Sequence, residues 1–356
     1  MLYQNILERI FKRALIEKAS DIHISTGKHP IIRVDGALIS LKEEKILDSK
    51  DTEGLALVIL GEKKDKFFDQ REIDMSYEYN DKARFRVNLF FQQNCVSIAM
   101  RFIPRDIKTI DELGLPSFLH SLIELRQGLV LVTGPTGHGK TTTLAAIIDE
   151  INHKSTKDHI VTIEDPIEYV FQQDKSIINQ REVGNDTKSF VRALKSTLRQ
   201  DPDVIMVGEM RDYESISIAL TAAETGHLVL STLHTNSAAQ TIDRIIDVFP
   251  VDQQHQIRIQ LAATLSGIIS QRLVRRVDSG RVPVCEIMTG VPAIRNIIRE
   301  ERTHELDMVI STSSDKGMIS LNRSLANLAM QRIISLQDAL GFSLNPSELK
   351  LMLRRS

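Results

Sequence analysis

The sequence predicts an α/β protein in two parts, and three observations lead to this class. A glycine-rich segment, "GPTGHGKTTT" (134–143), stands between an apolar run and a helix-like segment. Short apolar runs at 129–133, 160–164, 204–207 and 227–232 alternate with other segments, as the strands of a buried parallel sheet do. The first hundred residues instead alternate apolar and polar side chains, which is typical of an antiparallel α+β unit.

Length and composition favour a soluble protein of two or three domains. The 356 residues exceed one average domain, and the apolar content of 42% with 26% charged residues is typical of a globular chain. A net charge of −2 disfavours general nucleic-acid binding. The two cysteines, Cys95 and Cys285, cannot build a disulfide framework or a tetracysteine zinc site and indicate a reducing compartment. With neither a signal-peptide core nor a spanning segment, we expect membrane contact to be peripheral or through a partner.

The elements follow in order. Apolar residues at helical spacing between Ile6 and Leu15 predict an amphipathic helix, and 21–39 predicts a hairpin with its turn at Asp35 and Gly36. Strands are expected at 74–80, 83–91 and 96–103, which completes an N-terminal domain over 1–105. A linker is expected at 106–120, before a second domain over 121–356. From about residue 252 we expect helices only, with periodic segments at 254–273, 293–299, 321–331 and 346–354.

The glycine-rich segment predicts a nucleotide site. Residues 134–141 fit G-x-x-x-x-G-K-[ST], whose backbone N–H groups and following helix N-terminus surround phosphates. Lys140 would supply charge to the outer phosphates and Thr141 would complete a Mg²⁺ site, so ATP and Mg²⁺ are the expected cofactors. The residues expected to bind nucleotide are Gly134, Pro135, Thr136, Gly137, His138, Gly139, Lys140, Thr141 and Thr142. His138 could reach the nucleotide or a neighbouring subunit, or be a tolerated surface variant.

Carboxylates follow one of the predicted strands. Glu164, Asp165 and Glu168 come at or after the end of the run at 160–164. Strand carboxyl ends meet the ligand in such sheets, so these side chains could hold the Mg²⁺ water shell or orient water. Asp165 could instead cap a helix before Pro166.

Two further strands also end in candidate catalytic side chains. Glu209 follows the run at 204–207 and is the best candidate to polarise an attacking water, the alternative being a solvated loop glutamate. Arg211 is expected to make a structural ion pair. Of the two histidines around the strand at 227–232, we expect His234 to sense the γ-phosphate and His227 to be structural.

Taken together, several stretches resemble the type IV pilus retraction ATPases, within the larger class of secretion and pilus motor ATPases. They are "VTGPTGHGKTTTLAAII", "TIEDPIEY", "NQREVGNDTKSF", the long segment from "LRQDPDVIMVGEMRD" to "IDVFP", and "AIRNIIRE". The resemblance covers the whole chain, including "KASDIHI". "AIRNIIRE" (293–300) resembles the motif of the retraction branch, whereas the tail from Asn345 is similar to that of accessory retraction paralogues.

The resemblance implies a RecA-like ATPase core, a PAS-like N-terminal domain, C-terminal helices and assembly into a homo-hexamer. The catalytic residues that it implies are Glu209, His234, Glu164, Glu168, Arg86 and Arg101. Arg86 and Arg101 match family arginines that reach the phosphates from the N-terminal domain.

The function that the resemblance implies is that of a motor ATPase for pilus retraction and twitching motility. Such a protein is cytoplasmic and sits peripherally at the inner membrane, with a pilus platform protein and a paralogous pilus ATPase as partners. An accessory retraction paralogue and a secretion-system motor remain alternatives. A RecA-like nucleic-acid translocase is disfavoured because net charge is near zero and no basic-aromatic stretch is present, so no nucleic acid is expected.

Overall fold

The chain divides into two compact units in the computed structural model, which describes residues 2–34, 36–80, 83–103, 106–154 and 158–354. The first unit contains Met1–Asp106 and Pro166–Tyr169, and the second contains Ile107–Asp165 and Val170–Ser356. In the segment 106–120, expected as a linker, Ile110 and Leu119 are fully buried, and the chain belongs to the second unit from Ile107 onward.

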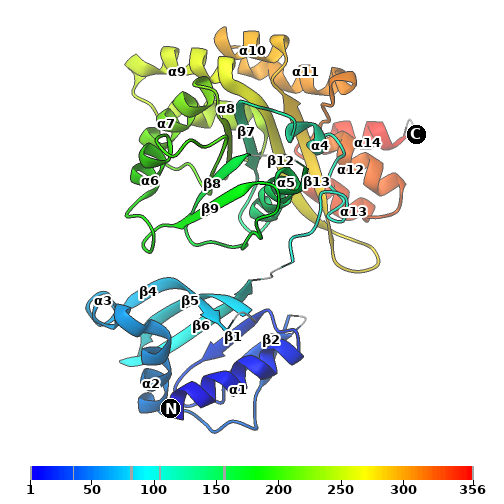
Figure 1. The fold of residues 1–356 in the computed structure, drawn as a ribbon. Coiled ribbons are helices and arrows are strands. Elements are labelled where there is room, and N and C mark those ends of the chain that lie inside the picture. Colours follow the sequence, from blue (N-terminus) through cyan, green and yellow to red (C-terminus); the bar gives the residue numbers. More distant parts are fainter. Residues whose placement is uncertain (1, 35, 81–82, 104–105, 155–157, 355–356) are drawn as a thin grey trace. The chain divides into compact units, whose positions relative to one another are not determined.

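The first unit is an antiparallel sheet with two long helices packed on it (Figure 1). Its elements are α1 (Leu2–Ile16), β1 (Asp21–Ile24), β2 (Ile31–Val34), β3 (Ala37–Ser40), α2 (Ser49–Leu60), η1 (Gly61–Lys63), α3 (Lys64–Gln70), β4 (Glu72–Tyr79), β5 (Ala83–Gln92) and β6 (Cys95–Ile103). The strand order is β3-β2-β1-β6-β5-β4. The predicted hairpin is confirmed, since β2 pairs with β3, but Asp35 of the predicted turn lies outside the described residues.

The predicted N-terminal helix covers the core of this unit. Ile6, Leu7, Ile10 and Phe11 of α1 are buried on one stripe, as helical spacing requires. The ring of Phe11 stacks on that of Phe85 from β5, with ring centroids 4.9 Å apart. Apolar burial along this stripe therefore holds α1 on the sheet.

The second unit is built on a mainly parallel sheet, which confirms the predicted α/β class. Its strands are β7 (Gly128–Thr133), β8 (His159–Glu164), β9 (Ile177–Glu182), β10 (Val204–Val207), β11 (Leu228–Leu233), β12 (Leu265–Arg275) and β13 (Arg281–Thr289). The order is β13-β12-β7-β11-β10-β8-β9, and β12–β13 is its antiparallel pair. The four predicted apolar runs are β7, β8, β10 and β11, all central strands with fully or largely buried side chains.

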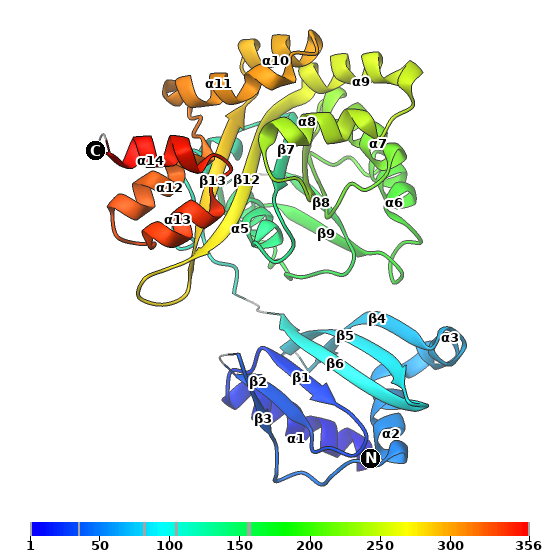
Figure 2. The ribbon, with the colours of Figure 1, turned by 180° about the vertical axis from the view of Figure 1, so that it is seen from behind.

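Helices cover this sheet (Figures 1 and 2). They are α4 (Leu119–Leu122), α5 (Lys140–Lys154), α6 (Phe190–Thr197), α7 (Tyr213–Glu224), α8 (Ala238–Asp247), α9 (Val251–Thr264), α10 (Pro292–Arg299), η2 (Thr303–Glu305), α11 (Leu306–Thr312), η3 (Ser314–Lys316), α12 (Leu321–Met330), α13 (Leu336–Phe342) and α14 (Pro346–Arg354). Helices α6 to α11 share one core with alternate residues of β7, such as Leu129 and Leu131. Helices α12 to α14 pack on the outer half of β12 and β13, against Val274, Val282 and Val284.

The expectation of helices only beyond residue 252 is wrong. The predicted helix over 254–273 ends at Thr264, and its second half is β12, which pairs parallel with β7 and antiparallel with β13. A short apolar run such as "LSGIISQ" fits either a buried strand or a helix by periodicity alone, so the long-range pairing with β7 decides its structure. The edge strand β9 was not predicted either. No helix in the described ranges is long and apolar enough to cross a bilayer.

Candidate nucleotide site

The loop 134–139 joins β7 to α5 and rests on β12. Gly134 has a φ of 141°, and a Cβ there would lie 2.2 Å from the carbonyl oxygen of Gln271. Gly139 has a φ of 80°, and its Cβ would approach Gln271 Nε2 to 3.0 Å. Positive φ and this close approach both require glycine, so the two glycines of the motif shape the loop against β12.

Lys140 is the first residue of α5 and is held across the loop. Its side chain is buried, at 8% exposed, and Nζ donates to the carbonyl oxygens of Gly134 at 2.9 Å and Pro135 at 3.1 Å. The ammonium group thus lies at the N-terminus of a 15-residue helix. The positive end of the helix dipole adds to its charge, which makes the loop suited to phosphate.

Four residues predicted from the sequence meet at this edge of the sheet. His234 Nδ1 lies 3.4 Å from Lys140 Nζ, and His234 Nε2 lies 3.1 Å from Glu209 Oε1. Thr136 Oγ1 of the loop lies 3.3 Å from His234 Nδ1. These side chains follow β7, β10 and β11, which are neighbours in the parallel sheet, so their carboxyl ends bring the side chains together.

Positive groups surround the Glu209 carboxylate. Arg211 Nη2 donates to Glu209 Oε2 at 2.8 Å, which is the ion pair predicted for Arg211. Partial burial acts to raise the pKa of Glu209, but the bond and charge of Arg211, with His234 and Lys140, outweigh burial and leave the pKa below its usual value. Glu209 is therefore ionised at neutral pH and can accept a proton or a hydrogen bond from water.

Glu164 occupies the end of β8 and is buried. Its Oε1 accepts hydrogen bonds from Thr162 Oγ1 at 2.7 Å and from Gln180 Nε2 at 3.1 Å. Because Gln180 comes from the unpredicted strand β9, this partner could not be found from the sequence. The two bonds fix the orientation of the carboxylate at the edge of the sheet.

The remaining predicted catalytic residues belong to the first unit. Arg86 and Arg101 stand directly opposite each other on β5 and β6. Arg101 Nε donates to Asp21 Oδ1 at 2.9 Å, whereas Arg86 Nη1 lies 4.0 Å from Glu168 Oε1. Each arginine therefore faces a carboxylate within its own unit, while Lys140 belongs to the second unit.

His138 is part of the packing of the loop. Its Nδ1 accepts the backbone N–H of Leu273 at 2.9 Å, and its ring meets that of Phe342 edge-on at 6.3 Å. Burial and the positive charges of Arg272, Arg281 and Lys140 lower its pKa, which keeps the imidazole neutral and able to accept. His138 is thus half-buried and hydrogen-bonded within the site.

Gln271 on β12 is a site residue that the sequence did not indicate. It is 2% exposed, its Oε1 accepts from Thr143 Oγ1 at 2.7 Å, and its Nε2 donates to the carbonyl oxygen of His138 at 2.8 Å. The side chain therefore ties the loop to the first turn of α5. The assignment of 254–273 to a helix hid this role, since a polar residue within a helix gives no hint of a partner so far away in sequence.

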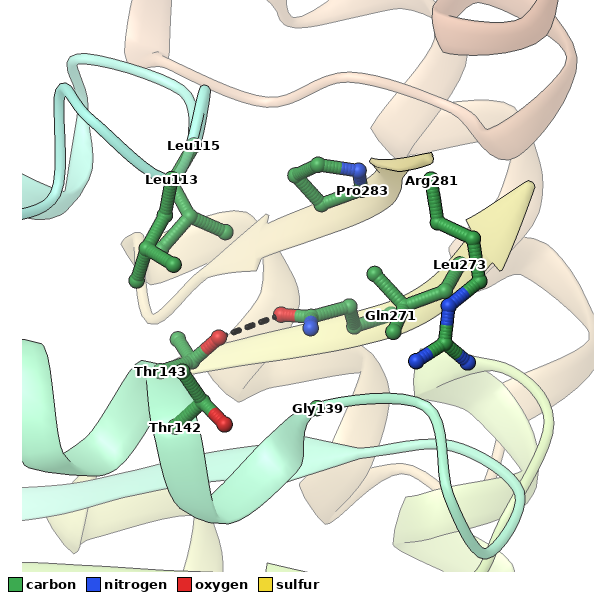
Figure 3. A pocket seen from close by; sticks show the side chains of 9 residues that line it. All are labelled: Leu113, Leu115, Gly139, Thr142, Thr143, Gln271, Leu273, Arg281 and Pro283. Atoms are coloured by element: carbon green, nitrogen blue, oxygen red, sulfur yellow. Dashed lines mark hydrogen bonds between the residues drawn. The ribbon is translucent and has the colours of Figure 1, made fainter. Parts of the chain in front are cut away.

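A cavity of about 270 Å³ opens beside the loop (Figure 3). Leu113, Leu115, Leu273 and Pro283 form apolar walls, and Thr142 lies at the first turn of α5. Leu113 and Leu115 come from the segment 106–120, which thus forms part of the site. Thr143, Gln271 and Arg281 add polar groups to the lining. Apolar walls with a few polar side chains, beside a phosphate loop, suit a nucleotide base.

The residues here also suit Mg²⁺. Thr141 is the second residue of α5 and is partly exposed, so its hydroxyl is accessible next to Lys140. Glu209 supplies an ionised carboxylate at the same edge of the sheet. Hydroxyl and carboxylate oxygens are ligands that Mg²⁺ accepts, often through water.

The motif "AIRNIIRE" forms α10. Ile294, Ile297 and Ile298 are buried in the core beneath it. Arg295 Nε donates to the carbonyl oxygen of Gly290 at 2.7 Å, just after β13. This helix packs beside α9, as Figures 1 and 2 show.

A phosphate loop at the start of a helix, with a carboxylate and a histidine at the ends of adjacent parallel strands, defines a P-loop ATPase. The chain matches the model of the type II/IV secretion system protein family over residues 2–327, and it belongs to that family. The resemblance inferred from the motifs is therefore confirmed.

Individual relatives agree with this assignment. The chain is 47% identical over 322 residues to the type IV pilus retraction ATPase PilT of Pseudomonas aeruginosa, covering 90% of this chain and 93% of that protein. It is 39% identical over 344 residues to the type IV pilus ATPase PilU of the same organism, covering 96% of this chain and 90% of that one. A crystal structure of the pilus retraction motor PilT with bound ADP matches with a TM-score of 0.90 and 47% identity, covering 96% of this chain and 98% of that one.

Proposed function

We propose that this protein hydrolyses ATP to drive the retraction of type IV pili. The observation that carries the proposal is the cluster of Lys140, His234 and Glu209 at the phosphate loop of a chain so similar to a pilus retraction ATPase. The cluster supports ATP hydrolysis. The similarity over nine tenths of the chain supports pilus retraction as the process that hydrolysis drives.

The loop and Lys140 bind the phosphates. Lys140 Nζ bonds to the carbonyl oxygens of Gly134 and Pro135, which keeps the ammonium at the loop. With nucleotide bound, the same group turns to the outer phosphates. The Thr141 hydroxyl would hold Mg²⁺, which would supply positive charge that offsets that of the phosphates. The cavity walled by Leu113 and Leu115 receives the base.

Glu209 and His234 serve the hydrolysis step. The ionised Glu209 carboxylate orients the attacking water and accepts its proton. His234 contacts both Glu209 and Lys140. A γ-phosphate bound at Lys140 therefore affects the position of the Glu209 carboxylate through His234. Glu164, fixed by Thr162 and Gln180, orders the water around Mg²⁺.

The N-terminal domain, 1–105, completes catalysis in the assembled protein as a PAS-like domain attached to the motor core at 121–356. Arg86 and Arg101 neutralise charge on the transferred phosphoryl group, and Glu168 takes part with them. To do so, Arg101 must leave Asp21 and Arg86 must leave Glu168, so that both guanidinium groups can bind phosphate oxygens. This exchange links the nucleotide state to movement of the domain.

The proposed working form is a homo-hexamer on the cytoplasmic side of the inner membrane at the pilus base. There it acts on a platform protein of the pilus machine and cooperates with a paralogous ATPase. An accessory role beside a principal retraction ATPase is the second candidate, because the match to PilU extends over 96% of this chain. Deletion of the gene separates the two, since loss of a principal motor abolishes retraction whereas loss of an accessory one weakens it under load.

Lys140→Ala tests the proposed activity. Removing the ammonium should abolish ATP hydrolysis and weaken nucleotide binding, and cells carrying the variant should not retract pili. The matched control is Lys154→Ala, which changes an exposed lysine at the other end of α5. Steady-state ATPase assays on the purified hexamers should show normal turnover in the control. Turnover at the wild-type rate in Lys140→Ala would refute the assignment of the phosphate site.

A further inference from the structure

Two buried charged side chains, Arg272 on β12 and Glu286 on β13, have no part in the mechanism above. They are 7% and 6% exposed. In the antiparallel ladder Arg272 stands opposite Val284 and Glu286 stands opposite Ser270, so both side chains leave the same face of the sheet two positions apart. Burial of a charge is costly unless the group is paired and hydrogen-bonded, so their partners define what they do.

Glu286 joins two helix N-termini. Its Oε1 accepts the backbone N–H of Ala238, the first residue of α8, at 2.7 Å. The backbone N–H of Leu321, the first residue of α12, lies close enough to lower the pKa of this carboxyl group. One carboxyl group thus lies near the N-termini of two helices, one of which begins four residues after His234.

Arg272 makes the same connection through carbonyl groups. Its Nη2 donates to the carbonyl oxygen of Asn236 at 3.2 Å, and its Nη1 donates to that of Phe342, the last residue of α13. Asn236 lies two residues after His234. Both side chains therefore bond to the segment 236–238, and Arg272 also bonds to the end of α13, while Glu286 lies near the start of α12.

A separate contact links the C-terminal helices to the phosphate loop. The ring of Phe342 lies edge-on to that of His138, which in turn accepts the N–H of Leu273 next to Arg272. The end of α13 therefore contacts the loop on one side and is held by Arg272 on the other. A shift of the loop or of the segment after His234 must change how these helices pack, because protein interiors are close-packed.

We propose that Arg272 and Glu286 are positioning residues that couple the nucleotide state at His234 to the docking of the C-terminal helices α12 to α14. When His234 responds to the γ-phosphate, the segment 236–238 moves, and the two side chains carry the change to α12 and α13. Coupling is reciprocal, so displacement of these helices must also alter turnover. This inference rests on the proposed role of His234 as the sensor of the nucleotide.

Hydrogen exchange of the full-length hexamer tests the coupling. Amide exchange in residues 321–342 is measured without nucleotide, with Mg²⁺ and ADP, and with Mg²⁺ and a non-hydrolysable ATP analogue. We expect the analogue and ADP to differ by at least about fivefold in this region, the lower end of ordinary coupling between sites. In Arg272→Lys and Glu286→Gln the difference should disappear. Wild-type exchange that is the same in all three states would overturn the proposal without any variant.

Kinetics separate positioning from simple damage to the fold. In Arg272→Lys, which keeps the charge but cannot span two carbonyl groups, kcat should fall at least about fivefold while KM for ATP stays within about threefold. The control is Arg276→Lys, whose guanidinium pairs with Asp278 near the turn of the hairpin. Arg272→Lys with unchanged kcat and a wild-type exchange response would show that the pair does not couple the two regions. A wrong assignment of the ATPase activity itself would be seen in a different experiment, as normal turnover in Lys140→Ala.

Discussion

The structure makes Gln271 the residue on which the shape of the phosphate loop most directly depends. Replacing it in Gln271→Leu leaves the buried hydroxyl of Thr143 and the carbonyl oxygen of His138 without their partners. Each unsatisfied buried group costs about 1–3 kcal/mol, and the burial of leucine offsets roughly 1 kcal/mol, so a net loss of about 3 kcal/mol follows. A domain of this size loses roughly 2–4 °C in Tm per kcal/mol, which gives a decrease of about 6–12 °C.

The assay is thermal unfolding of the nucleotide-free protein, followed by ATPase kinetics at a temperature where the variant is folded. Because the loop is less firmly held, nucleotide affinity should also fall by about tenfold, the equivalent of roughly 1.4 kcal/mol. Gln256→Leu is the matched control, since Gln256 is exposed on α9 and should change Tm by no more than about 2 °C. A Gln271→Leu protein that melts within about 2 °C of the wild type would refute the argument that these two bonds hold the loop.

Three further outcomes are expected. Glu209→Gln should retain ATP binding but lose about 10²–10⁴-fold in kcat, and loss of binding as severe as in Lys140→Ala would instead indicate a metal or structural role. Arg86→Ala and Arg101→Ala should each leave ATP affinity intact but lower turnover by about 10³-fold or more in a steady-state assay, and near-normal turnover in both would exclude a catalytic role. Burial raises the pKa of Glu286 from 4.5 to about 7, so the folded state favours the protonated form of this side chain. The stability that this preference contributes is fully present below pH 4.5 and is lost as the pH rises through 7. The wild type should therefore lose roughly 3 kcal/mol relative to Glu286→Gln across that window, whereas parallel profiles of Tm against pH would contradict the shift.

The Glu286 prediction depends on the charges that face this group. The nearby negative charge of Asp307 on α11 also raises its pKa, whereas the N–H groups of Ala238 and Leu321 and the positive charge of Arg272 lower it. Asp307 is itself partly buried, which raises its own pKa. Asp307→Asn should therefore lower the pKa of Glu286 and narrow the pH window over which stability changes, as thermal unfolding between pH 4.5 and 8 would show.

Sequence reasoning located the phosphate loop and the strands around it because these features are local. The loop motif spans ten residues, and the buried strands β7, β8, β10 and β11 each consist of a short apolar run. In a parallel sheet the side chains that follow such runs must gather at one edge. This rule is enough to bring Glu209 and His234 to Lys140, as the structure shows.

The same reasoning could not find what lies behind the loop. Gln271 bonds to Thr143, which is 128 positions away, and Arg272 joins Asn236 to Phe342. Such contacts exist only because β12 pairs with β7 across the sheet, and periodicity does not distinguish a buried strand there from a continued helix. The residues proposed to carry out the chemistry can therefore be found from local sequence motifs. The support of the loop, the burial of His138 and the connection to the C-terminal helices were decided by tertiary pairing, since long-range register alone brings those side chains together.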